Sequence, residues 1–175
     1  MKKLMIVVLL LLPFGAKAGE LTGQLGPSLT LIGKISEPAG IVSVRDANIG
    51  LDGELAYFWQ SLGVGVNLLL STAQANVLGM DFDGSITGIT AGPRYKLALA
   101  EKLAFLASAG VGNYTLEMAL GHENSFGWML GSEIQYSLTD KAYIAFKGTF
   151  HYISDIGGND DATVFGFGPH IGLRF

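Results

Sequence analysis

The end of the chain alternates between two kinds of side chain. Large apolar residues occupy positions 165, 167, 171, 173 and 175, and Gly166, Gly168, His170, Gly172 and Arg174 lie between them. Successive side chains of a β-strand point to opposite faces, so a period of two predicts a strand with one apolar and one polar face. This strand runs to the carboxy-terminal residue, Phe175.

The first residues have the pattern of an export signal. Lys2 and Lys3 precede an apolar run that ends at Phe14, and Ala-Lys-Ala at 16–18 gives small residues where a signal peptidase reads. We predict cleavage after Ala18, which divides the chain into a signal peptide over 1–18 and a barrel domain over 19–175. The apolar run is too short for a spanning helix, which argues against a retained anchor.

The composition indicates where the remaining apolar residues lie. Hydrophobic residues make up 49% of the chain and charged residues 15%, yet no apolar run of about 18 residues follows the signal. Hydrophobicity that is spread by alternation and interrupted by 25 glycines favours strands that face lipid on one side. Only a closed barrel satisfies the backbone of such strands within a membrane.

Charge and cysteine content exclude several functions. The net charge is −4, and it becomes −7 when Lys2, Lys3 and Lys17 leave with the signal. A nucleic-acid partner is therefore not expected, because phosphate binding needs clustered basic residues. The chain has no cysteine, so it has no disulfide and no thiolate metal site. We predict no cofactor and no metal site.

Eight alternating segments predict an all-β fold, a transmembrane antiparallel up-and-down β-barrel of eight strands. The segments are 20–33, 49–60, 63–72, 85–97, 103–117, 126–138, 142–153 and the terminal strand. Gln60 is predicted to point inward. Near Gly112 the phase slips so that Tyr114 and Leu116 continue the apolar face, which predicts a bulge. Short connections alternate with long ones, and an even strand number then puts both termini in the periplasm.

Nine ionisable side chains are predicted to face the lumen. Eight strands leave an interior only wide enough for side chains, so buried charges must neutralise one another. These residues are Asp52, Glu54, Arg94, Lys96, Glu133, Lys147, His151, His170 and Arg174. We expect Glu54 and Glu133 to pair with Arg94, Lys147 and Arg174. The network predicts a structural plug, and a gated ion path in which pairs exchange partners is the alternative.

The chain resembles a known superfamily. The signal, the eight segments, the Gly-Pro-Arg-Tyr run at 92–95 and the terminal Gly-Leu-Arg-Phe are similar to the small outer-membrane β-barrels. These include the outer membrane protein A transmembrane domain and the opacity and attachment-invasion proteins. The resemblance implies the outer membrane of a Gram-negative bacterium, contact with outer-membrane lipid and lipopolysaccharide, and delivery by the barrel-assembly machinery through the strand ending at Phe175. It also implies interior acid–base pairing similar to that of outer membrane protein A.

The resemblance constrains function less than fold, because members serve as structural barrels, adhesins, narrow pores or lipid A enzymes. We predict a monomeric, non-enzymatic barrel with a structural or surface-interaction role. A narrow pore for ions or small solutes is the alternative, and a lipid A-modifying enzyme is the third candidate. The lipid A 3-O-deacylase barrels place His and Ser two residues apart. Here His151 and Ser154 are three apart and point to opposite faces.

Overall fold

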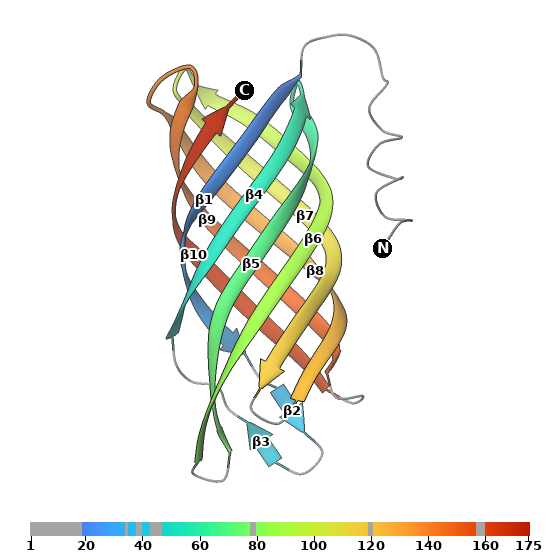
Figure 1. Ribbon diagram of the computed structural model, residues 1–175. Helices are drawn as coiled ribbons and strands as arrows, with labels where there is room; N and C mark the ends of the chain where they lie inside the picture. Colours follow the sequence, from blue (N-terminus) through green and yellow to red (C-terminus); the bar gives the residue numbers. More distant parts are fainter. Residues whose placement is uncertain are drawn as a thin grey trace.

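The computed structural model describes residues 19–33, 35–37, 40–42, 47–77, 80–118, 121–156 and 160–175. Eight long strands close into a barrel in which every neighbouring pair is antiparallel, which confirms the predicted fold class (Figure 1). Around the barrel they follow the order β1, β10, β9, β8, β7, β6, β5 and β4. The strands are β1 (Glu20–Gly33), β4 (Ala47–Trp59), β5 (Leu62–Val77), β6 (Met80–Ala100), β7 (Leu103–Met118), β8 (Gly121–Ser137), β9 (Ala142–Ile156) and β10 (Asp160–Arg174).

Two further strands, β2 (Ile35–Glu37) and β3 (Gly40–Val42), pair as a small separate sheet in the connection between β1 and β4. Figure 1 shows this sheet at the end of the barrel that lies opposite the carboxy terminus. The sequence did not predict it, because three residues are too few for a period of two to be recognised.

The two ends of the barrel differ. At one end the connections 60–61, 101–102 and 138–141 are short, and Gly19 and Phe175 lie at this same end, here called the turn end (Figure 1). The other end, here called the loop end, carries the connection 34–46 and the connections 78–79, 119–120 and 157–159. The prediction of long segments over 73–84, 118–125 and 154–162 was wrong, because the strands extend through most of these residues. Gln60 is exposed in the first turn and has a φ of 68°. Its predicted inward orientation was wrong, because the strand ends at Trp59 and the chain reverses there.

The outer surface of the barrel is apolar and the interior is largely polar. Large side chains such as Leu130, Phe146 and Ile171 point outward and are more than half exposed, whereas Thr30, Asn67 and other polar side chains are buried inside. This arrangement is the inverse of a water-soluble barrel and matches one that faces lipid. Among the described residues there is no helix of the length and hydropathy that a membrane crossing requires.

Strand β7 corrects one prediction. Its pairing with β6 and with β8 continues without a shift through Gly112, so the predicted bulge is absent there. Tyr114 and Leu116 are instead buried in the lumen. Glycines on the neighbouring strands make room for the Tyr114 ring, since a Cβ atom would lie 2.6 Å from it on Gly88 and 2.7 Å from it on Gly127.

The lumen is filled at three levels. Toward the loop end a buried apolar layer contains Ile32, Leu69, Ile86, Tyr114, Leu116, Ile153, Ala162 and Val164. Toward the turn end a smaller apolar layer contains Ala56, Phe58 and Leu106. Between these two layers lie buried charged and polar side chains. The inward-facing side chains therefore form a polar layer that lies between two apolar layers.

Candidate functional site

The central level of the lumen holds ionisable side chains from five strands. Asp52 and Glu54 lie two residues apart on β4, so both point inward, and they are 2% and 7% exposed. Arg94 on β6, Lys147 on β9 and His170 on β10 reach them from the other walls of the barrel. We call these five residues the central network; Glu133 on β8, the fifth strand, lies beside it.

Lys147 joins the two carboxylates of β4. Its Nζ atom lies 2.7 Å from Asp52 Oδ1 and 2.9 Å from Glu54 Oε2. The other Glu54 oxygen, Oε1, accepts from Arg94 Nε at 2.9 Å. The four side chains are at most 3% exposed, so water contributes little to their solvation. Each charge therefore depends on its partners inside the barrel.

Further contacts hold the network in place. Arg94 Nη1 donates to the carbonyl oxygens of Ala109 at 2.9 Å and Pro93 at 3.1 Å. The Asn67 side-chain amide lies 3.2 Å from both Asp52 oxygens. His170 Nε2 is also 3.2 Å from Asp52 Oδ1. The network is thus tied to the walls of the barrel at several points.

Glu133 differs from the expected pairing. Its carboxylate is 3% exposed and accepts from the side-chain amides of Gln24 at 2.6 Å and Gln135 at 2.7 Å. Although Lys147 is its direct neighbour on β9, the ammonium extends across the lumen to Asp52 and Glu54. Within the described residues, the expected ion pairs of Glu133 with Arg94 and Lys147 are not formed, because Glu54 and Asp52 take both cations.

His151 lies outside the central network. Its Nδ1 atom is 2.8 Å from the Tyr114 hydroxyl, and the side chain is buried next to the loop-end apolar layer. Ser154, on the opposite face of β9, donates its hydroxyl to the Phe126 carbonyl at 2.9 Å. The structure therefore does not bring His151 and Ser154 together, as their spacing predicted.

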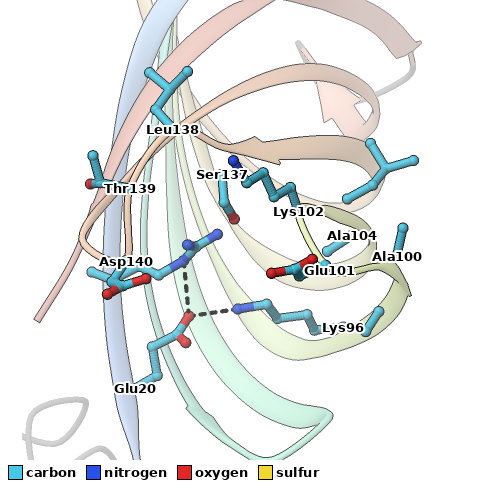
Figure 2. Close-up of a pocket in the computed structure, with 13 residues that line it drawn as sticks. Glu20, Lys96, Ala100, Glu101, Lys102, Ala104, Ser137, Leu138, Thr139 and Asp140 are labelled. Atoms are coloured by element: carbon cyan, nitrogen blue, oxygen red, sulfur yellow. Dashed lines mark hydrogen bonds and ion pairs between the residues drawn. The ribbon is translucent and has the colours of Figure 1, made fainter.

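Lys96 and Arg174 form a separate group with Glu20 at the turn end. Figure 2 shows Lys96 pointing toward Glu20. Both cations lie near Glu20 Oε1, Lys96 Nζ at 2.6 Å and Arg174 Nε at 3.6 Å. Each cation also lies over a buried aromatic ring: Lys96 over Phe58, and Arg174 over Tyr143. These residues line a hollow of about 480 Å³ that is partly open.

Sequence reasoning placed Lys96 and Arg174 inward but missed their partner. Glu20 has the same parity as the inward residues Thr22 and Gln24, and that signal was available. The expected pairing of Arg174 with Glu54 is replaced by its contact with Glu20. Phe175 points outward and is 74% exposed, and its N–H donates to the Leu21 carbonyl at 2.8 Å. This bond continues the pairing of β10 with β1 that closes the barrel.

A closed antiparallel barrel with an apolar outer face and a polar interior defines the class of outer-membrane β-barrels. Residues 4–175 match the family described as the outer membrane protein beta-barrel domain, and the chain belongs to this family. The family places it in the outer membrane of a Gram-negative bacterium, in contact with membrane lipid. No curated protein gives a significant sequence match.

Solved structures share this fold. Neisserial surface protein A is 14% identical, with a TM-score of 0.65, over 93% of this chain and 100% of that one. Ail, the attachment invasion locus protein of Yersinia pestis, is 16% identical, with a TM-score of 0.54, over 91% and 100%. Ail in complex with the heparin analogue sucrose octasulfate gives 17% and 0.53 over the same shares. At such identities the likeness concerns the fold.

Proposed function

We propose that the chain is a closed, monomeric, non-enzymatic outer-membrane barrel with a structural or surface-interaction role. The observation that carries this proposal is the filled lumen, in which apolar layers enclose buried ion pairs. In this proposal the signal is removed after Ala18, the assembly machinery reads the strand that ends at Phe175, and the turn end with both termini faces the periplasm.

The filling of the lumen opposes conduction in two ways. A hydrated ion would have to displace apolar side chains such as Phe58 and Leu116, which are 2% and 3% exposed. It would then meet Lys147 and Arg94, whose charges are already held by Asp52 and Glu54. Separating such buried pairs leaves unpaired charges, which costs several kcal/mol. The pore alternative therefore requires a rearrangement of both kinds of layer.

Planar-bilayer recording tests this proposal. The purified wild-type protein is expected to give no steady current above that of a lipid-only bilayer. Phe58→Ala removes part of the turn-end layer and leaves the ion pairs of Lys147 in place, so it should also remain silent. A steady wild-type current would replace the proposal with the pore. A change in the mass of lipid A when the protein is expressed would replace the proposal with a lipid A-modifying enzyme.

The charge of the loop end supports a surface role with a particular preference. Segments 34–48, 73–84, 118–125 and 154–162 contain eight acidic and two basic residues. In this proposal they face the exterior, where an acidic surface attracts cationic partners and repels polyanions. Ail crystallised with a heparin analogue, but we do not expect the same ligand here. Retention of the detergent-solubilised protein on heparin at physiological salt would contradict this preference, and retention on polylysine would support it.

A further inference from the structure

We infer that the hollow at the turn end is a binding site for a small zwitterion, a molecule with a singly charged oxyanion at one end and an ammonium group at the other. The site lies outside the central network and goes beyond the proposed structural role. It rests on the proposed function only for the orientation, which would supply the ligand from the periplasm. Three observations carry it: hydrogen-bond donors without acceptors, charges of opposite excess at two levels, and the space between them.

The two inner cations of the hollow have donors that the barrel does not use. Arg174 Nε lies 3.6 Å from Glu20 Oε1, beyond hydrogen-bond distance, and this buried atom has no hydrogen-bond partner among the described residues. Lys96 Nζ donates to the same Glu20 oxygen at 2.6 Å, which uses one of its three N–H groups. A buried donor of this kind calls for an acceptor from outside the fold.

Aromatic rings hold both cations in position. Lys96 Nζ is 5.5 Å from the centre of the Phe58 ring, and Arg174 Cζ is 4.8 Å from that of Tyr143. Gly172 leaves room for the Tyr143 ring, and both rings are at most 2% exposed. The side chains of Lys96 and Arg174 are themselves only 19% and 13% exposed. The cations are therefore largely ordered before a ligand arrives, which lowers the entropic cost of binding.

The inner group of the hollow has one positive charge in excess. Lys96 and Arg174 face a single carboxylate, that of Glu20, and both approach the same oxygen of it. An oxyanion with one negative charge would balance this group. A carboxylate or a phosphodiester meets that condition, whereas a phosphate monoester or a polysulfate brings more charge than the group can neutralise.

The rim of the hollow has the opposite excess. Glu101 and Asp140 line it together with one cation, Lys102, and all three residues are exposed on the turns 101–102 and 138–141 (Figure 2). Among the described residues, none of the three has an ion-pair partner. Lys141, in the same turn as Asp140, does not line the hollow. An ammonium group at the rim would therefore find two carboxylates and one competing cation.

Small side chains create the space between the inner group and the rim. Ala98, Ala100 and Ala104 line the hollow, whose volume of about 480 Å³ is ample for a ligand of this size. A zwitterion that fills it would place its oxyanion against the inner cations and its ammonium group against the rim carboxylates. Amino acids and short peptides have this chemistry, and so does the ethanolamine headgroup of a phospholipid.

Nitrogen-15 NMR of the Arg174 Nε–H group tests the site, with Arg174→Gln to identify the signal. Glycylglycine supplies a carboxylate and glycerophosphoethanolamine a phosphodiester, each with an ammonium group. The protein from outer membranes is held in a neutral maltoside detergent, so that no zwitterionic detergent competes. A saturable shift is expected, with an affinity about fivefold higher than that of acetate, because one exposed ion pair adds up to about this factor. Ethylamine, the cation alone, should not shift the signal.

The two probes distinguish the sources of the ligand. Binding of glycylglycine alone would support an amino acid or peptide, and binding of glycerophosphoethanolamine alone a lipid headgroup. Binding of both would support the shared chemistry. The inference would be overturned by the lack of a saturable shift with either probe, or by acetate binding as tightly as the zwitterions.

Substitutions separate the inner group from the rim. Lys96→Gln should weaken acetate and zwitterion alike, about tenfold, because it removes a charged donor. Glu101→Gln combined with Asp140→Asn should weaken only the zwitterion, to the affinity of acetate. This double variant changes turns alone, so it keeps the test valid if Lys96→Gln does not fold. Glu123→Gln, at the exposed loop end, is the matched control and should change neither affinity.

A rim variant that keeps the preference for the zwitterion, or an equal loss in Glu123→Gln, would contradict the proposed ligand. The outcome is separate from that of the bilayer recording. A conducting barrel that binds the zwitterion would overturn only the closed-lumen function, and a silent barrel that does not bind it would overturn only this site.

Discussion

Glu54 is the carboxylate on which the central network depends most, and Glu54→Gln is the sharpest test of that network. Its two oxygens take two different cations, Arg94 Nε and Lys147 Nζ, both at 2.9 Å. The substitution preserves size and removes one charge. Lys147 keeps Asp52 at 2.7 Å, but Arg94 is left with carbonyl partners alone.

The magnitude follows from this difference. Removing one partner of a buried ion pair costs about 3–5 kcal/mol. Since only Arg94 loses its counter-charge, we expect the lower part of that range, about 3 kcal/mol of unfolding free energy. Glu133→Gln is the matched control, because it removes a buried carboxylate whose direct partners are amides. Its expected cost is about 1 kcal/mol.

The assay is reversible urea unfolding in phospholipid vesicles, followed by the fluorescence of Trp59 and Trp128. Arg94→Met completes a double-mutant cycle, in which Glu54 and Arg94 should couple by about 2 kcal/mol. The network would be refuted by equal losses for Glu54→Gln and Glu133→Gln. Coupling near zero between Glu54 and Arg94 would show that water, and not the partner side chain, solvates these charges.

Three further outcomes test the faces, the packing and the processing of the barrel. Leu130→Arg, on the lipid face, should cost about 2–4 kcal/mol of unfolding free energy near the membrane midplane. Gln135→Arg should cost less, because Glu133 can pair with the new guanidinium group. Equal losses in urea unfolding would mean that β8 is shifted by one residue. Gly88→Val should destabilise by about 1–3 kcal/mol through its clash with the Tyr114 ring, and Tyr114→Ala should relieve this loss. Intact mass of protein from outer membranes should begin at Gly19, and a mass that includes residues 1–18 would contradict cleavage after Ala18.

The strands and their faces were predictable because one face of each strand meets lipid and the other faces the lumen. Lipid requires an apolar side chain at every second position, so residues such as Leu25 and Leu55 mark the outer face wherever they occur. The same rule failed at Tyr114 and Leu116. There the lumen is itself apolar, both faces of β7 carry apolar residues, and the alternation no longer distinguishes inside from outside.

The partners of the charges were not predictable from the sequence. Alternation placed Glu133 and Lys147 in the lumen as candidate partners, and in the sheet the two residues are direct neighbours. The actual partners of Lys147 lie on β4, across the barrel, and which residues meet there depends on the stagger of the strands and on the diameter of the barrel. Those two quantities are properties of the closed sheet and leave no signal in any one strand.

The division of the lumen into levels links the fold to the proposed role. An ion pair between apolar layers is strengthened by the low dielectric that those layers create, and it is costly to open for the same reason. Phe58 and Leu106 on one side and Tyr114 and Leu116 on the other restrict the access of water to the central network.

A substitution in either apolar layer should therefore weaken the ion pairs without changing the residues that form them. We expect the coupling between Glu54 and Arg94 to be smaller in Phe58→Ala than in the wild type. An unchanged coupling would mean that the layers only fill space, and that the charges keep the lumen closed without them.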